Sequence, residues 1–168
     1  MNKKQIKELL NSLTLDQKIG QLFQCPGIVF DQDGAVTGIS YLPWLNEDYI
    51  NNCGSILNIY DNKRLRDIQR KHLEKNPVPL MIMADIINGY RVVFPSSIAQ
   101  GCSFNPKLTE RAAEITAFES AKNGVNVTFS PMVDVARDAR WGRISECYGE
   151  ATVLNSDFGV ANVKGYQG

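Results

Sequence analysis

The chain has 168 residues, which bounds it to about one domain, and its apolar fraction of 43% and charged fraction of 21% are those of a globular protein. Eighteen basic and eighteen acidic side chains cancel, so the charge balance does not favour a nucleic-acid partner. No apolar run approaches the ~20 residues of a membrane-spanning helix, and the first residues lack the apolar segment of a secretory signal. These features predict a cytoplasmic protein with no membrane partner.

The cysteines and the one histidine give no sign of a metal site. Cys25, Cys53, Cys102 and Cys147 form no CxxC pair, and only His72 could join them as a ligand. We therefore expect free thiols in a reducing compartment, no bound metal and no cofactor. His72 falls in a charged helical segment, where we expect it to be solvated.

The chain begins with helical patterns over about residues 1–24. Ile6, Leu9 and Leu10 share one face of a first helix, and Thr14 and Gln17 have the spacing of a capping box that opens a second. The second helix is expected to place three apolar residues on one side: Ile19, Leu22 and Phe23. Residues 25–48 then show no periodicity and predict a long irregular segment.

From residue 54 onward, short apolar runs alternate with helical patterns. Strands are predicted over 54–60, over 79–85 and from 125, and helices over 63–75, over 106–122 and over 153–166. The second of these helices is bounded by the capping pair Asn105-Pro106 and by Asn123-Gly124. The side chains expected to face inward are Leu65, Ile68, Leu73, Leu108, Ala112, Ile115, Phe118, Leu154, Phe158 and Val163.

This alternation predicts an α/β fold with a parallel sheet made of about three βα units. Neither GxGxxG nor GxxxxGK[ST] follows a strand, so the strongest nucleotide-binding signals are missing. The pattern is compatible with a doubly wound layer or with the N-terminal portion of a (β/α)8 barrel.

Polar residues gather where the second and third predicted strands end. Asp85 follows the second strand and Arg91 lies six positions later, while the segment PMVDVARDARWGRISECYGE, residues 131–150, follows the third strand and contains Arg143. Ligands of both candidate folds bind at the carboxyl ends of the strands. Carboxylates accept and guanidinium groups donate hydrogen bonds, which suits a polyol such as a sugar, but also a carboxylate or phosphate ligand.

Four segments of the chain together resemble a known family. TLDQKIGQL, PLMIMADIINGYRVVFP, the stretch from AQGCSFNP to RWGRISECYGE and VANVKGYQG are similar, in this order, to the N-terminal domain of glycoside hydrolase family 3, in its β-glucosidase and β-xylosidase branch. The resemblance begins at about residue 12. It implies that residues 1–168 form part of a (β/α)8-type barrel domain, preceded by the N-terminal helices.

The resemblance also implies an activity, the retaining hydrolysis of terminal β-D-glycosides. That reaction uses an Asp nucleophile and a Glu acid/base about 5–5.5 Å apart. By position, Asp85 matches the residue that accepts sugar hydroxyls, Arg91 an Arg near the same subsite, and Arg143 the Arg that holds the sugar. No residue here matches the nucleophile, the acid/base or the Lys-His pair of the family, which are expected beyond residue 168.

The chain departs from the family pattern at several positions. Asn88 stands where His is common, and Cys147 stands where Gly is usual. Ala151 and Thr152 replace the usual Asp and Pro, which predicts a less well capped start of the last helix.

The other polar residues of segment 131–150 are expected to shape it. Arg137, Asp138 and Arg140 predict structural ion pairs, and Trp141 predicts a buried aromatic side chain. Glu146 is expected to pair with Arg143 and to fix its orientation.

The length of the chain bears on its activity. A complete barrel takes about 250 residues and at least ~200, so this chain is expected to be a fragment without glycosidase activity of its own. It would bind a β-glycoside or a monosaccharide. Two alternatives stay open: half of a split barrel that needs a second chain, and a non-catalytic sugar-binding or structural remnant.

Overall fold

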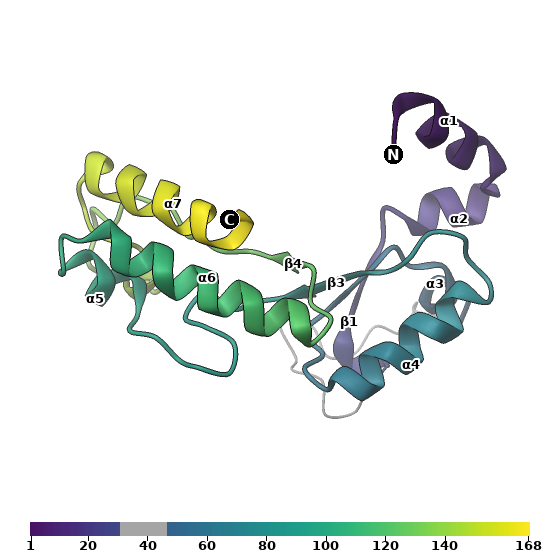
Figure 1. The fold of residues 1–168 in the computed structure, drawn as a ribbon, viewed down its shortest axis with the longest axis horizontal. Helices are drawn as coiled ribbons and strands as arrows, with labels where there is room; N and C mark the ends of the chain where they lie inside the picture. Colours follow the sequence, from purple (N-terminus) through teal and green to yellow (C-terminus); the bar gives the residue numbers. More distant parts are fainter. Residues whose placement is uncertain (31–46) are drawn as a thin grey trace. The chain divides into compact units, whose positions relative to one another are not determined.

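A computed structural model describes residues 1–30 and 47–168 of the chain. The described residues form two compact units, Met1–Ala84 and Asp85–Gly168. Figure 1 shows the order of the elements along both units.

The first unit begins with two short helices, each opened by a capping box. In α1 (Lys3–Ser12) the box joins Asn2 and Gln5, and in α2 (Leu15–Gly20) it joins Thr14 and Gln17, as the sequence predicts. The predicted common face of the second helix is wrong. The helix ends at Gly20, so Leu22 lies outside it and is 90% exposed.

Three parallel strands form the sheet of the first unit. They are β1 (Gln24–Pro26), β2 (Ser55–Leu57) and β3 (Met81–Ala84), with β2 in the centre. Cys25, Ile56 and Ile82 pair in register and are all buried, so the middle of the sheet is apolar. Strand β1 was not predicted, because three residues ending in Pro are too few to show a period.

The expected irregular segment 25–48 can be compared with the structure only at its ends. There the chain forms β1, the 3₁₀ turn η1 (Gly27–Val29) and helix α3 (Glu47–Asn52), while residues 31–46 lie outside the described part.

Helix α4 (Asn62–Leu73) covers the sheet of the first unit. Leu65 and Ile68 are buried as predicted, but Leu73, at the last turn, is 46% exposed, so its predicted inward position is wrong. The expectation of a solvated His72 is also wrong. Its ring is buried, Nε2 lies 3.0 Å from the carbonyl oxygen of Val78, and burial lowers the pKa of this histidine.

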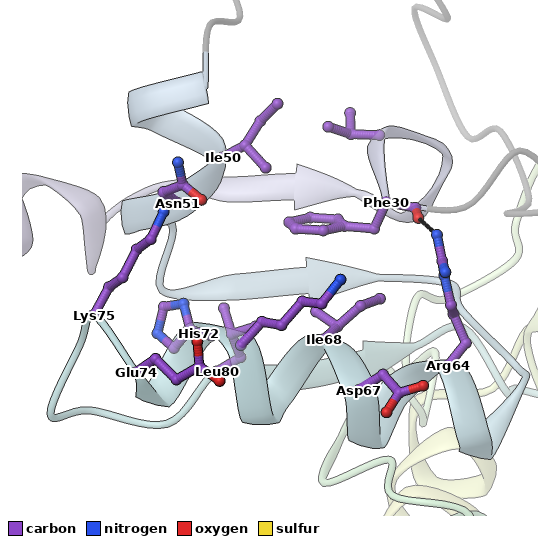
Figure 2. Close-up of a pocket in the computed structure, with 12 residues that line it drawn as sticks. Phe30, Ile50, Asn51, Arg64, Asp67, Ile68, His72, Glu74, Lys75 and Leu80 are labelled. Atoms are coloured by element: carbon purple, nitrogen blue, oxygen red, sulfur yellow. Dashed lines mark hydrogen bonds between the residues drawn. The ribbon is translucent and has the colours of Figure 1, made fainter.

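A cavity of about 500 Å³ lies beside α4 in the first unit. Figure 2 shows Phe30, Ile68 and Leu80 at this cavity and the hydrogen bond of 2.7 Å from Arg64 Nη2 to the carbonyl oxygen of Phe30. Asp85, Arg91 and Arg143 all belong to the second unit, so this cavity is not the predicted site.

The second unit contains α5 (Ser97–Gly101), α6 (Pro106–Lys122), β4 (Val127–Thr128), the 3₁₀ turn η2 (Ile144–Glu146) and α7 (Thr152–Gln167). The predicted boundaries of α6 are confirmed. Asn105 caps its start through the N–H of Lys107, Pro106 is its first residue, and Gly124 follows its end with a φ of 94°. Helix α5 was not predicted.

Helices α6 and α7 lie side by side and form the core of the second unit (Figure 1). The face of α6 that is buried consists of Thr109, Ala113, Thr116 and Ser120. The predicted inward face is wrong, since Leu108 and Phe118 are 58% and 66% exposed.

The reason for this difference is the short distance between the two helices. A Cβ atom on Gly165 of α7 would lie 2.6 Å from Cβ of Ala113 and would overlap the carbonyl oxygen of Glu110. Only small side chains fit there, so size rather than hydrophobicity selects the buried face. On α7, Phe158 is fully buried as predicted, whereas Val163 is 40% exposed and was predicted wrongly.

All four cysteines are free thiols, with Cys25, Cys53 and Cys147 buried and Cys102 exposed. In the described ranges, 1–30 and 47–168, no three His, Cys, Asp or Glu side chains come together as a metal site would require. None of the helices described there combines the length and apolar character needed to cross a bilayer.

Candidate functional site

The side chain of Arg143 is fixed along one edge of its guanidinium group. Nε donates to Oε1 of Glu146 at 3.0 Å and Nη2 donates to Oε2 at 2.6 Å, which confirms the predicted pair. Nη2 also lies 3.5 Å from Sδ of Met132. Nη1 has no hydrogen-bond partner among the described residues, and the Arg143 side chain is 53% exposed. One edge of the group is thus oriented by the protein and the other faces outward.

The charges around Arg143 identify its neighbours. The hydrogen bonds and charge of Glu146 raise the pKa of Arg143, and the carboxylates of Asp85 and Asp134 add to this effect. In return, Arg143 lowers the pKa of Glu146. The pair therefore stays ionised at neutral pH, and two further carboxylates lie close enough to act on the same guanidinium group.

Asp85 and Arg143, which lie far apart in the sequence, are thus electrostatic neighbours in the structure. Asp85 directly follows β3 in the chain and is exposed, and Asp134, also exposed, belongs to the segment that follows β4. The sequence analysis did not select Asp134 as a site residue. Its place just after a strand, in the same segment as Arg143, is the signal that could have identified it.

Arg91 lies at the C-terminal end of α6. Its guanidinium Nη2 donates to Oδ1 of Asn123 at 3.0 Å. The backbone N–H groups of Arg91 and Val92 donate to Oε2 of Glu119 at 3.0 and 3.1 Å. The structure therefore gives Arg91 a role in holding its loop on α6, and its role in binding substrate stays a prediction.

The remaining charged residues of segment 131–150 follow the predicted pattern in part. Asp138 and Arg140 form the expected ion pair, with hydrogen bonds of 2.9 and 2.6 Å. Arg137 forms no ion pair within the part of the chain that the structure describes, so its predicted pairing is wrong. Trp141, predicted to be buried, is half-buried.

Two backbone contacts hold the segment that carries Arg143. The N–H of Ala136 donates to the carbonyl oxygen of Gly149 at 3.2 Å, so this hydrogen bond joins the two ends of the segment 136–149. Gly101 of α5 packs so closely on Tyr148 that a side chain at Gly101 would overlap the Tyr148 carbonyl oxygen. The site is thus built on a closed segment that rests on a helix.

A guanidinium group with one open edge, near carboxylates, presents donors and acceptors together. This arrangement suits a ligand with neighbouring hydroxyl groups, because carboxylates accept and guanidinium groups donate hydrogen bonds. Parallel strands, helices and polar residues in the segments that follow the strands are features of an α/β domain of the barrel type, in which ligands bind at the carboxyl ends of the strands.

The model of the glycosyl hydrolase family 3 N-terminal domain matches residues 14–168, and the chain belongs to this family. This finding confirms the resemblance drawn from the sequence. It also confirms the predicted fold class, part of a (β/α)8-type α/β barrel.

Individual relatives agree with this assignment. A periplasmic β-glucosidase of Salmonella typhimurium is 36% identical over 165 residues, which cover 97% of this chain and 20% of the relative. A β-glucosidase of Listeria innocua, solved in complex with isofagomine, superposes with a TM-score of 0.92 at 40% identity over 100% of this chain and 23% of its own. The same enzyme solved with glucose gives a TM-score of 0.88 at 39% identity, over 100% of this chain and 24% of its own. The chain thus spans about a fifth to a quarter of these relatives.

Proposed function

We propose that this chain contributes part of the sugar-binding site of a β-glucosidase-like glycoside hydrolase that acts on terminal β-D-glycosides. The observation that carries the proposal is the orientation of Arg143, whose Nε and Nη2 are bound by Glu146 while Nη1 stays open near Asp85. The family of the chain and the β-glucosidases among its relatives support the choice of ligand.

In this proposal the two residues divide the recognition of one sugar ring. The carboxylate of Asp85 accepts hydrogen bonds from two adjacent hydroxyl groups, and Nη1 of Arg143 donates to a hydroxyl oxygen. Glu146 keeps the guanidinium plane fixed, so little side-chain freedom is lost when the sugar binds. Arg91 is proposed as a further residue near the same subsite.

The proposal assigns binding, and not bond cleavage, to the residues of this chain. Retaining hydrolysis requires two carboxyl groups about 5–5.5 Å apart in the roles of nucleophile and acid/base. We assign neither role to Asp85, Asp134 or Glu146, because Glu146 is bound to Arg143 and no family motif matches any of the three to those roles. Cleavage would then need carboxyl groups from further sequence of the family domain, in the same polypeptide or in a partner.

Glucose is the probe for a first test, with binding followed by NMR titration of the ¹⁵N-labelled chain. We expect R143K to weaken glucose binding by about 10-fold or more, because lysine cannot keep the two bonds to Glu146 and also present a second edge. R140K is the control, since Arg140 forms a pair of the same two-bond kind with Asp138 outside the proposed site, although the Arg140 side chain is 90% exposed and that of Arg143 53%. It should bind glucose like the unmodified chain.

A second pair of variants tests the acceptor. D85N keeps the shape of the side chain but removes its charge, and should weaken binding to a similar extent, whereas D138N should not. If the unmodified chain fails to bind glucose, or if R140K and D138N weaken binding as much as R143K and D85N, the proposed site is wrong.

A further inference from the structure

The start of α7 is held by the side chain of Asn155, inside the helix, and not by its N-cap residue. Its N-cap, Ala151, has no side chain that could accept a backbone hydrogen bond. One turn further on, Asn155 is 2% exposed and turns its side chain back to the residues before the helix. A buried asparagine needs partners for its amide group, and Asn155 finds them there.

Asn155 makes three hydrogen bonds to the turn that precedes α7. Oδ1 accepts from the N–H of Tyr148 at 3.1 Å, and Nδ2 donates to the carbonyl oxygens of Gly149 at 2.7 Å and Ala151 at 3.0 Å. Both donor hydrogens of the amide group are therefore used. The side chain of Asn155 therefore binds the turn Tyr148–Ala151 to α7.

The same turn is the point at which the segment of Arg143 closes. The carbonyl oxygen of Gly149 accepts from Nδ2 of Asn155 and also from the N–H of Ala136. The first and last residues of the segment 136–149 are thus joined at the carbonyl oxygen of Gly149, and Asn155 binds the same oxygen. The pair of Arg143 and Glu146 lies within this closed segment, with Glu146 only two residues before Tyr148.

We propose that Asn155 is a positioning residue for Arg143. By holding Tyr148 and Gly149 on α7, it fixes the place of Glu146, and Glu146 in turn fixes the guanidinium plane of Arg143. The consequence for ligand binding rests on the proposed sugar site, but the positioning itself can be measured without a ligand.

Asn162 provides a matched control on the same helix. It is also buried, at 6% exposure, and its Nδ2 donates to the hydroxyl of Tyr148 at 3.1 Å. It therefore touches the far end of the Tyr148 side chain and not the backbone turn. Loss of its amide group should affect stability without releasing the segment of Arg143.

The test uses the full chain labelled with ¹⁵N-arginine. The Nε–H signal of Arg143, assigned by its loss in R143K, reports the bond to Glu146 through its exchange with water. We expect N155A to speed this exchange by about fivefold or more, as loss of supporting hydrogen bonds permits local opening, and N162A to change it by less than about twofold. An unchanged rate in N155A, or an equal increase in N162A, overturns the proposal.

If N155A does not fold, N155D keeps the acceptor for Tyr148 and should speed the exchange as well. The unmodified chain offers a second measurement. The Tyr148 amide proton and the Arg143 Nε–H should show the same dependence of exchange on low concentrations of urea, since one opening exposes both. Exchange of the Arg143 proton that is independent of urea while the Tyr148 amide responds contradicts the proposal.

A glucose titration of the same samples separates the two proposals. If the unmodified chain does not bind glucose but N155A releases Arg143, Asn155 is a positioning residue and the proposed sugar site is wrong. If glucose binds through Arg143 and N155A changes neither its affinity nor the Arg143 exchange, the sugar site stands and the role of Asn155 is wrong.

Discussion

Gly101 and Tyr148 approach each other so closely that no side chain fits between them. A Cβ atom on Gly101 would overlap the carbonyl oxygen of Tyr148, which belongs to the turn that closes the segment of Arg143. Because a backbone atom cannot move aside as a flexible side chain can, the contact fixes the distance between α5 and this turn.

We expect G101A to destabilise the second unit by about 1–3 kcal/mol, the usual cost of overpacking a close contact. Urea unfolding measured by fluorescence gives this number. G142A is the control, because a Cβ atom on Gly142 meets no atom within 4 Å. Equal stability of the two variants would show that the contact between α5 and the turn is not needed.

Acid should release Arg143. Arg143 lowers the pKa of Glu146, so the folded form holds the charged carboxylate more firmly than the unfolded chain does. The stability from this pair is therefore present above the ordinary glutamate pKa of about 4.3 and is lost as the pH falls through the lowered value. The Arg143 Nε–H exchange at fixed temperature, corrected for the intrinsic pH effect, should rise in this range.

E146Q should remove this acid dependence, because glutamine does not titrate. E150Q is the matched control, since Glu150 is exposed and belongs to the same turn region. The expectation fails if E146Q and the unmodified chain respond to acid alike.

Alkali should weaken the second unit through Tyr148. Burial raises the pKa of Tyr148 to about 12. The unfolded chain therefore loses this proton first, from about pH 10, so stability falls as the pH rises from about 10 to about 12, by roughly 2–3 kcal/mol. Unfolding free energies at pH 9 to 12 should show this slope, and Y148F should reduce it. Y60F, in the first unit at a residue that is 45% exposed, should not.

Arg91 can be tested for its two roles with one pair of variants. R91A and N123A both remove the hydrogen bond between Arg91 and Asn123, which should cost about 1 kcal/mol in stability in each variant. N123A should cost about 1 kcal/mol more, because it also removes the hydrogen bond of 2.7 Å from Asn123 Nδ2 to the carbonyl oxygen of Glu119. N123A retains the guanidinium group of Arg91 but removes its hydrogen-bond acceptor on α6. If Arg91 binds sugar as the family resemblance implies, R91A weakens glucose binding more than N123A, and equal affinities would remove Arg91 from the site.

The sequence predicted the fold where the signal is local. The capping box of Thr14 and Gln17 and the boundaries of α6 depend on neighbouring residues, and both are confirmed. The buried face of α6 depends on α7 instead. Gly165 brings the helices so close that Ala113 and small polar residues are buried in place of Leu108 and Phe118, and no pattern within α6 contains that information.

In the candidate site too, the contacts between near neighbours in the sequence were predicted and those between distant residues were not. The pairing of Arg143 with Glu146, three residues apart, follows from local spacing and was predicted. The contribution of Asn155 was not, because it depends on how the segment closes at Gly149. That of Asp134 was not selected either, although its place in the segment after a strand is a signal that the sequence contains. His72 was wrongly predicted to be solvated for a similar reason. Its ring lies against the carbonyl oxygen of Val78, a residue beyond the end of α4 that the pattern of the helix does not include.

The capping box of α1 has a consequence for how the amide protons of this helix exchange with solvent. Helix α1 has no buried residue, and its cap is made entirely between Asn2 and Gln5. Such a helix needs nothing from the rest of the molecule to define its first turn, and it gains nothing from the core to keep it formed. Its amide protons should exchange almost freely in the native protein, while those of α6 and α7, which pack against each other, are retained.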